Sequence, residues 1–398
     1  MTSRPRRRPD KTILMKRNLR RIWLKAHQLL GLTAGLLFAL AGLTGSILVF
    51  EKPLDTLLNH EIMQTDNRGQ RISLEALVER VQPRHADLGK IDRIAVPRHE
   101  AEVFMVRFTP SIAGKPRPRP VEVFVDPVTG ETLGQRPRNS GLIEWIYDLH
   151  ARLLTGWSGR TIMGIVALSA LTLLVSGILL WWPLLKGGSR IAFGVRRTKF
   201  NFDLHKVMGL GGTLPLLLIS FTGVYLGLPS LVKPIVHIFS SETPPPKNIV
   251  STRMQDDQQT LTPDRAVELA LQRMPGAELF HVDLPEGATG TYKVFLRQPG
   301  EFEQLRGSGR IWLDQYSGEV LATRDWEAFT FADTYFRLQV PLHNGDVFGI
   351  VGRCLFCVAG LIPAILYVTG FLLWWRKKRS KVRKAASVER RAAVRSSL

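Results

Sequence analysis

The stretch "LHARLLTGWSGRTIMGIVALSALTLLVSGILLWW" (residues 149–182) occurs again, 193 positions later, as "LHNGDVFGIVGRCLFCVAGLIPAILYVTGFLLWW" (residues 342–375). The two copies align without a gap, so His150 matches His343 and both copies end in two tryptophans. The apolar part of each copy is longer than the roughly 20 residues that a helix needs to cross the hydrocarbon core of a bilayer. We therefore expect two equivalent membrane helices and an internal duplication of the chain.

A second pair of apolar stretches repeats at a constant offset of 178. "HQLLGLTAGLLFALAGLTGS" (27–46) matches "HKVMGLGGTLPLLLISFTGV" (205–224), and this alignment places His27 opposite His205. The sequence thus predicts two tandem copies of a helix, an exported region and a second helix. Because an even number of crossings separates the copies, we expect them to share one orientation and to be related by a pseudo-two-fold axis along the membrane normal.

The formal net charge of +20 is concentrated in residues 1–25, 183–204 and 376–398, which together carry +22 and leave −2 for the rest of the chain. By the positive-inside rule these three segments are cytoplasmic, and the long stretches between them lie on the other side of the membrane. In a bacterial inner membrane that side is the periplasm. The basic charge therefore indicates topology, and we expect no nucleic-acid partner.

The fold class that we expect is a membrane α-helical protein with added α+β modules. The first apolar block is too long to be a removable signal peptide, so we interpret it as an uncleaved helix. The predicted segments are a basic N-terminus (1–26), a first membrane helix (27–50), a first periplasmic module (51–152), a second helix (153–182), a cytoplasmic loop (183–204), a third helix (205–228), a second module (229–345), a fourth helix (346–375) and a basic tail (376–398).

Each exported stretch has the pattern of a small α+β module. Residues 73–81 and 262–274 are typical of amphipathic helices, the second with Thr262 as N-cap and Pro263 in the first turn. "VEVFVDPVTGETL" and "RIWLDQYSGEVL" predict hairpins whose turns contain an Asp and a Gly. The two cysteines, Cys354 and Cys357, both fall in the fourth helix, where we expect them to pack, so no disulfide framework supports these modules.

The two hairpins, the leucine–histidine pair before a Gly-Arg helix that ends in Trp-Trp, and the duplicated four-helix layout together resemble the PepSY-associated transmembrane family. The resemblance extends over roughly residues 25 to 380. It implies a link to iron uptake, and some members of the family resemble inner-membrane ferric-siderophore reductases that carry b-type haem.

The four duplicated histidines are the strongest candidates for chemistry. Ionisable groups at membrane depth are costly and are rarely incidental. A two-fold axis makes His27 face His205 and His150 face His343, and two opposed imidazoles are what a six-coordinate haem iron requires. We therefore predict two b-type haems, the first pair lying near the cytoplasmic face and the second near the periplasmic face. The alternative is that each histidine binds no haem and only forms a hydrogen bond at the membrane interface.

Other residues are assigned around these pairs. Gly31 and Gly209 follow their histidines by four residues, so they lie on the same helical face and leave a notch for a porphyrin or for helix packing. Arg160 and Arg353 need an anion, which is a haem propionate, a lipid phosphate or a carboxylate. His60 and His237 are candidates for haem or chelate contacts. We expect the paired tryptophans (181, 182, 374 and 375) to lie in the aromatic belt at the membrane interface. We expect His85, His99 and His281 to be exposed to solvent.

Two classes of function remain open from the sequence. In one, haems relay electrons from quinol or a cytoplasmic protein to a ferric siderophore or another iron chelate, which makes the protein an oxidoreductase that releases ferrous iron. In the other, the protein is a haem-free, membrane-anchored binding or regulatory device. Transport ranks last, since no Asp, Glu or Lys lies deep in the apolar blocks. The Gly-rich "GLGGT" (209–213) follows no strand, so a nucleotide site is not expected.

The charge distribution generates a topology prediction. A reporter fused after Leu398 or within 183–204 should behave as cytoplasmic, and one within 110–120 or 242–250 as periplasmic. Alkaline phosphatase, which is active only outside the cytoplasm, provides the measurement. Activity of the Leu398 fusion would reverse the orientation and with it the direction of electron flow.

Overall fold

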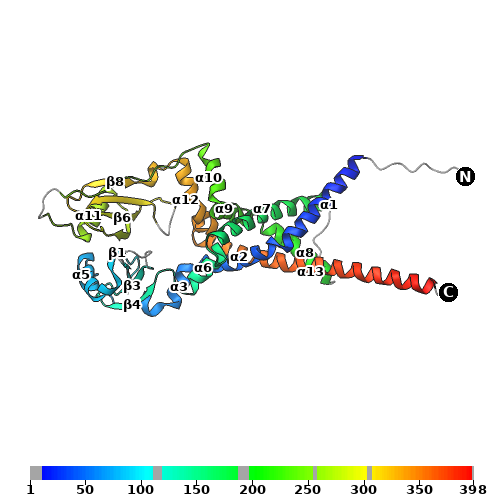
Figure 1. The fold of residues 1–398 in the computed structure, drawn as a ribbon, viewed down its shortest axis with the longest axis horizontal. Helices are drawn as coiled ribbons and strands as arrows, with labels where there is room; N and C mark the ends of the chain where they lie inside the picture. Colours follow the sequence, from blue (N-terminus) through cyan, green and yellow to red (C-terminus); the bar gives the residue numbers. More distant parts are fainter. Residues whose placement is uncertain (1–10, 111–118, 187–196, 254–257, 303–306, 397–398) are drawn as a thin grey trace.

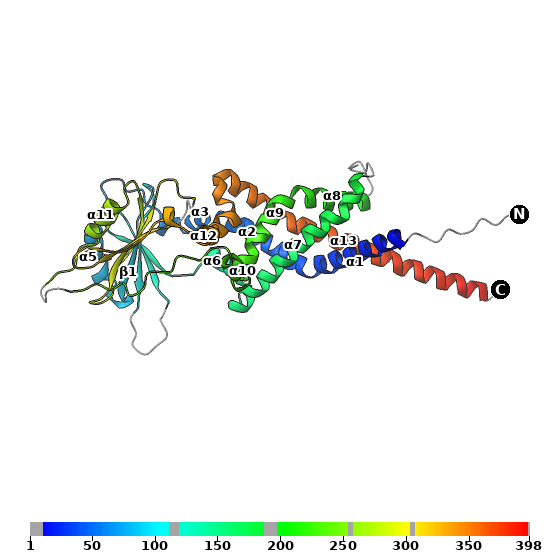
Figure 2. The ribbon, with the colours of Figure 1, turned by 90° about the horizontal axis from the view of Figure 1, so that it is seen from above.

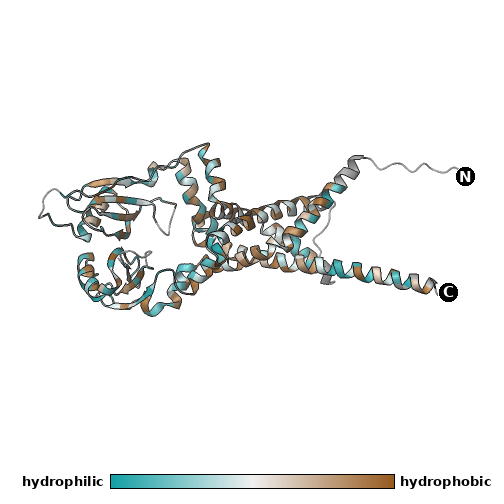
Figure 3. Ribbon diagram, in the orientation of Figure 1, coloured by the Kyte–Doolittle hydropathy of each residue, from teal (hydrophilic) through white to brown (hydrophobic). Residues whose placement is uncertain are grey.

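The computed structural model describes residues 11–110, 119–186, 197–253, 258–302 and 307–396. The first ten residues of the predicted basic N-terminus and residues 187–196 of the predicted basic loop lie outside these ranges. The molecule is elongated, with a β-sheet domain at one end and a helical bundle behind it, and α1 begins and α13 ends on the side away from the sheet (Figure 1). Apolar residues are concentrated along the bundle, whereas the last part of α13 is hydrophilic (Figure 3).

The bundle contains the apolar blocks found in the sequence. Its helices are α1 (Lys11–Leu32), α2 (Ala34–Leu48), α7 (Trp157–Lys186), α8 (Arg197–Gly211), α9 (Thr213–Gly227) and α13 (Gly349–Ser396). Two helices, in α7 and α13, are long and apolar enough to cross a membrane by themselves. In the pairs α1–α2 and α8–α9, the two helices are long and apolar enough only when they are taken together as one span. The described residues therefore contain up to four spans. The protein therefore spans the membrane, and each bent pair is either one broken span or a re-entrant loop.

The breaks in these two spans have local causes. α1 and α2 are bent by 52°, and α8 and α9 by 63°. At the first bend the Thr33 hydroxyl donates to the carbonyl of Leu29, a contact that competes with the helix ladder. At the second bend Pro215 has no amide hydrogen to donate to the preceding turn. Straight helices were expected from the sequence, because the apolar pattern continues through both bends.

Shorter helices connect the bundle to the sheet or cover the sheet. They are α3 (Glu51–Leu58), α4 (His60–Met63), α5 (Leu74–Arg84), α6 (Leu142–Arg152), α10 (Pro229–His237), α11 (Pro263–Arg273) and α12 (Phe331–Asn344), with 3₁₀ turns at Ala86–Leu88, Trp326–Ala328 and Asp346–Phe348. The predicted N-cap Thr262 is confirmed, because it accepts from the amide of Arg265. Ser73, which was not predicted as a cap, accepts from the amide of Ala76 and caps α5 in the same way.

A single antiparallel sheet of eight strands forms the extramembrane domain, in the order β4-β3-β2-β1-β5-β6-β7-β8. The strands are β1 (Lys90–Ala95), β2 (Phe104–Thr109), β3 (Val121–Val125), β4 (Thr132–Pro137), β5 (Glu278–Asp283), β6 (Thr291–Arg297), β7 (Gly309–Asp314) and β8 (Val320–Arg324). The two halves of the chain join where β1 pairs with β5, with Ile94 opposite Val282.

The continuous sheet differs from the two separate modules that the sequence predicts. The hairpins lie where they were expected, but β1 and β5 were not anticipated, because charged residues interrupt "KIDRIA" and stand at both ends of "ELFHVD". Two separate four-stranded sheets would each leave a row of unpaired backbone groups at β1 or β5. Pairing these edges satisfies them, and it fixes the two halves of the chain to each other.

One hydrophobic core serves both halves of the sheet. α5 and α11 pack on the same face, where Leu77 and Ala266 join Ile94, Val282 and other strand residues in one buried cluster. The carboxylate of Asp264 in α11 accepts from the amides of Leu74 and Glu75, so the second half of the chain caps a helix of the first. The two modules therefore form one domain.

A buried aspartate organises each hairpin. Asp126 is fully buried and accepts hydrogen bonds from the amides of Val128 and Thr129, from the Thr65 hydroxyl and from the Asn67 side chain. Burial alone would raise the pKa of Asp126, but these hydrogen bonds together lower it to about 2. Asp314 makes the matching amide contacts with Tyr316 and Ser317 in the second hairpin.

The substitution Asp126→Ala should destabilise the sheet domain by about 2–4 kcal/mol, since it leaves several buried donors without an acceptor. The apparent thermal midpoint of the full-length protein in detergent measures this loss. Asp66→Ala, which removes an exposed carboxylate close by in the sequence, serves as the matched control and should leave the midpoint unchanged. Equal thermal midpoints for the two variants would show that Asp126 does not stabilise the sheet domain.

The difference between wild type and Asp126→Ala should also depend on pH. Because the folded pKa lies below the unfolded value of about 4, the charged aspartate stabilises the fold above that value, by roughly 2 kcal/mol. The difference in stability should therefore be constant above about pH 5 and should shrink as the pH falls from about 4 towards 2. A difference that persists unchanged at pH 2.5 would contradict this account.

Candidate functional site

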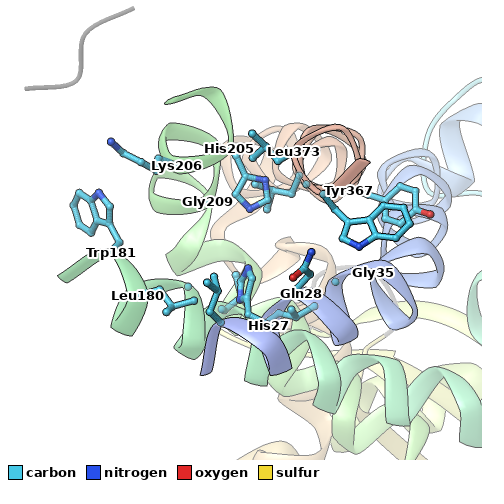
Figure 4. Close-up of a pocket in the computed structure, with 18 of the residues that line it drawn as sticks. His27, Gln28, Gly35, Leu180, Trp181, His205, Lys206, Gly209, Tyr367 and Leu373 are labelled. Atoms are coloured by element: carbon cyan, nitrogen blue, oxygen red, sulfur yellow. The ribbon is translucent and has the colours of Figure 1, made fainter. Parts of the chain in front are cut away.

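The four duplicated histidines form two facing pairs. His27 in α1 and His205 in α8 have ring centroids 6.4 Å apart, with their planes at 79°. His150 in α6 and His343 in α12 have centroids 6.1 Å apart, at 63°. Figure 4 shows His27 and His205 projecting towards one another across an open space. The structure thus brings together the residues that the sequence paired.

The separation within each pair suits a shared metal ion. A metal–imidazole nitrogen bond is about 2 Å long and the ring centre lies roughly 1 Å further back, so two imidazoles on one ion have centres about 6 Å apart. Among the described residues, no group of three or more His, Cys, Asp or Glu could hold a bare ion. Haem iron brings four ring nitrogens and needs only two axial ligands, so the donor set fits haem.

A hydroxyl group holds the Nδ1 atom of every one of these histidines. The four contacts are His27 to Ser176 (2.8 Å), His205 to Thr369 (2.9 Å), His150 to Thr44 (3.0 Å) and His343 to Thr222 (2.9 Å). His150 Nδ1 also lies 3.0 Å from the carbonyl of Ala41, which can only accept, so Nδ1 carries the proton there. The neutral ring then has its lone pair on Nε2, the atom left for a metal.

A glycine follows each of these hydroxyl residues and lies against the histidine ring. A methyl group in place of the glycine hydrogen would lie 3.6 Å from the histidine Cε1 atom at Gly177, 3.4 Å at Gly370 and 3.5 Å at Gly223, which are ordinary contacts, and 3.0 Å at Gly45, which is tight. The sequence analysis did not assign a role to these pairs. The signal was present, because each of the four apolar blocks has one Ser-Gly or Thr-Gly pair that contacts a histidine.

A cavity of about 720 Å³ surrounds the pair His27–His205. This volume is within the range of cofactor sites. Gly31 and Gly209 line it, and neither has a side chain that would fill the space. Residues on both sides of the two helix bends, such as Leu32 and Thr213, also line the cavity, so the bends help to open it.

Four cations line the same cavity near its cytoplasmic end, as the sequence orients the chain: Arg20, Arg21, Lys206 and Lys377. Lys206 Nζ lies 3.5 Å from Asp203. Arg20, Arg21 and Lys377 are therefore the cations suited to bind the carboxylates of a ligand whose apolar part fills the remaining space. The sequence analysis did not assign these residues, because cations at this position were explained by topology alone. Trp181 and Trp374 line the cavity as well, which adds to the interfacial role expected for them.

Arg160 and Arg353, the predicted propionate partners, bind backbone carbonyls. Arg160 Nε donates to the carbonyl of Leu226 at the end of α9 (2.8 Å), and Arg353 donates to that of Val49 at the end of α2 (3.2 and 2.7 Å). Carbonyls in the last turn of a helix have no partner within the helix. Each arginine thus ties a helix of one repeat to a helix of the other.

The remaining predicted residues lie outside the two pairs. His60 is exposed, and His237 lies 3.7 Å from Glu242 and packs on Phe336. Cys354 is exposed and Cys357 is half-buried, and both are free thiols. The carbonyl of Cys357 accepts from Ser46 Oγ at 2.7 Å, where α2 and α13 cross closely.

The expectation for two of the unpaired histidines was wrong. His281 has only 12% of its side chain exposed and stacks on Phe295, because it lies between neighbouring side chains on the sheet. His85 is half-buried and its Nε2 lies 3.0 Å from the Thr132 hydroxyl. His99 is exposed, as expected.

Comparison with known proteins supplies an independent result. The chain matches the family model of the PepSY-associated TM region over residues 24–377, which includes the bent helix pairs, the sheet and both histidine pairs. A search of curated proteins finds no match. Since the family model covers most of the chain, this membrane-spanning protein belongs to the PepSY-associated transmembrane family.

Proposed function

We propose that the protein is a b-type haem electron-transfer protein of the bacterial inner membrane that reduces ferric siderophores or other ferric chelates in the periplasm and so releases ferrous iron. The observation that supports this proposal most directly is the pair of facing imidazoles at each end of the bundle, 6.4 and 6.1 Å apart, each with its Nδ1 atom held by a hydroxyl.

At the cytoplasmic end, His27 and His205 would be the axial ligands of a first haem. Gly31 and Gly209 leave space for the macrocycle, and the cations Arg20, Arg21 and Lys377 would bind its propionates. The haem propionate was one of the three anions that the sequence analysis considered for Arg160 and Arg353. The three cations of the cavity also keep the acidic edge of the haem next to the side of the membrane from which we expect electrons to arrive.

At the periplasmic end, His150 and His343 would be the axial ligands of a second haem. They lie in α6 and α12, which lead from the last strand of each half of the sheet into the bundle. Seventeen positions separate His27 from Thr44, the residue that holds His150. At 1.5 Å per residue this is about 25 Å along a straight helix, and the bend between α1 and α2 shortens the distance. The two sites therefore lie at opposite ends of the apolar bundle.

Bound haem supplies reversible one-electron chemistry, which amino-acid side chains do not offer. Each ferric ion takes up one electron to become ferrous. The donor is quinol, which yields two electrons and two protons, or a reduced cytoplasmic protein. The protein's own contribution is to hold four imidazoles with Nε2 free, to surround them with apolar helices that exclude water, and to place the outer pair beneath the sheet domain.

Removal of one ligand should remove one haem. Wild type should contain two haems per chain, and His27→Ala and His150→Ala should each contain about one, measured by pyridine haemochrome against protein concentration. His99→Ala, at an exposed site, is the control and should keep both. If both ligand variants retain the full haem content with an unchanged low-spin spectrum, the assignment fails. A haem-free wild type would favour the binding or regulatory alternative.

The hydroxyl contacts should tune the haem sites. Thr222→Val keeps the side-chain shape but removes the contact to His343 Nδ1, so we expect haem affinity to fall about 10- to 100-fold. Thr172→Val is the matched control, since Thr172 donates only to its own helix at Leu168. Haem loss to apomyoglobin, followed by absorbance, measures the difference. Equal rates of haem loss in the two variants would show that the Thr222 hydroxyl does not contribute to haem binding.

The reduction itself can be tested with purified protein. After reduction with dithionite and removal of the excess, ferric siderophores are added anaerobically in the presence of a ferrous trap. Reoxidation of the haem with stoichiometric ferrous release is the expected result. Haem that stays reduced with every ferric chelate, while quinones reoxidise it, would assign the protein to a different electron-transfer role.

A further inference from the structure

The helix α13 continues for about six turns beyond the two tryptophans that we expect at the membrane interface. Residues 376–398 contain ten Lys and Arg and one acid. In two views at right angles this part of α13 runs on in line with the bundle and away from the sheet domain (Figures 1 and 2). It therefore projects into the cytoplasm, as the sequence orients the chain.

The membrane interface accounts for the cations that come first along this part of the helix. Lys378 Nζ lies 5.3 Å from the centre of the Trp374 ring, and the guanidinium of Arg379 lies 4.5 Å from that of Trp375. These two cations thus stay beside the interfacial tryptophans, at the level of the lipid headgroups. Basic residues at that level follow from topology alone.

Four other cations lie along one face of α13. Lys377, Lys381, Lys384 and Arg391 follow one another at spacings of four, three and seven residues, and all four are exposed. At 3.6 residues per turn these spacings keep them within a sector of about 80° around the helix axis. We call them the basic stripe. Glu389, the one acid among residues 376–398, lies on another side of the helix.

The basic stripe begins at the cavity of the first histidine pair. Lys377 lines that cavity together with His27 and His205. The face of α13 that borders the cavity is therefore the face that carries the stripe. From Lys377 to Arg391 the stripe leads about 21 Å outward, at 1.5 Å per residue.

Neither the bilayer nor the stability of the helix accounts for the outer part of the stripe. Lys384 lies about 14 Å and Arg391 about 24 Å beyond Trp375 along the helix axis. The headgroup layer adds only about 5–8 Å to each side of the hydrocarbon core, and electrostatic attraction at physiological salt decays over about 8 Å. Like charges three or four residues apart also disfavour a helix. A quinol needs no such charges, because it reaches the protein from within the bilayer.

We propose that the basic stripe binds an acidic one-electron carrier protein and, resting on the proposed function, that this carrier is the electron donor. The stripe would attract the acidic surface of the carrier and orient it towards the cavity. A carrier of about 100 residues has a radius of gyration of roughly 13 Å, so it can contact the stripe and the rim of the cavity together. The carrier is then oxidised by one electron, one ferric ion held by His27 and His205 becomes ferrous, and no bond forms or breaks.

Binding can be measured without electron transfer. The probe is oxidised flavodoxin, a small acidic flavoprotein, titrated by calorimetry into the full-length protein in detergent. We expect it to bind at about 20 mM salt, with an affinity that falls at least about tenfold at about 200 mM salt. Flavodoxin whose surface carboxylates have been converted to neutral amides is the control partner, and we expect no measurable binding.

Two double variants locate the site. Lys381→Gln combined with Lys384→Gln should weaken the binding of flavodoxin about tenfold. Arg379→Gln combined with Arg383→Gln removes the same charge from the other side of the helix and should weaken it at most about twofold. None of these four residues lines the cavity, so both variants should keep the haem content of wild type.

Three results would each overturn the inference: no binding at low salt, equal binding of the amidated flavodoxin, or equal weakening by the two double variants. The lipid surface is tested by reconstitution into nanodiscs. If flavodoxin binds in neutral nanodiscs but not in anionic ones, the basic stripe binds lipid headgroups and the inference is wrong.

The failure of this inference and the failure of the proposed function are distinguishable. Reduced flavodoxin or a soluble quinol is mixed anaerobically with the oxidised protein, and the absorbance of the haem is followed. If the quinol reduces the haem and flavodoxin does not, the carrier inference fails and the proposed function stands. If flavodoxin binds to the stripe as described but the protein contains no haem, the proposed function fails and the docking site stands.

Discussion

A half-buried imidazole in an apolar helical bundle needs a partner for its ring nitrogens, and this requirement organises the membrane part of the protein. Each of the four histidines has its Nδ1 atom against a Ser or Thr hydroxyl, with a glycine directly beside it. The contact fixes the direction of the ring, so that Nε2 is the atom left for a ligand. Without these contacts the rings would be free to turn, and the 6 Å spacing within each pair would not be maintained.

The spacing also depends on how the two repeats are held together. In the bundle, α2 crosses α13 at Gly42 and Gly360, and α7 crosses α9 at Gly164 and Gly227, where side chains would collide with the opposing backbone. Outside the bundle, β1 and β5 join the two halves of one sheet. Because every one of these contacts links one repeat to the other, the histidines of the two repeats are brought face to face.

The histidine pairs and the sheet differ in how closely the two repeats match. Each repeat contributes one imidazole to each pair. In the sheet, by contrast, Lys293 and Arg310 of the second half correspond to Met105 and Glu122 of the first half. The two halves of the chain therefore have the same residue at the histidine positions and different residues on the sheet.

The sequence by itself determined the duplication, the apolar blocks and the pairing of His27 with His205 and of His150 with His343, because periodicity, constant offsets and hydropathy are local properties of the chain. It also predicted the helix cap at Thr262 and the two hairpins. Only the tertiary structure decided the helix bends, the cavity, the carbonyl partners of Arg160 and Arg353, and the seam between β1 and β5. These features depend on which strand and helix lie next to each other, and neighbouring elements in space are often distant in the sequence.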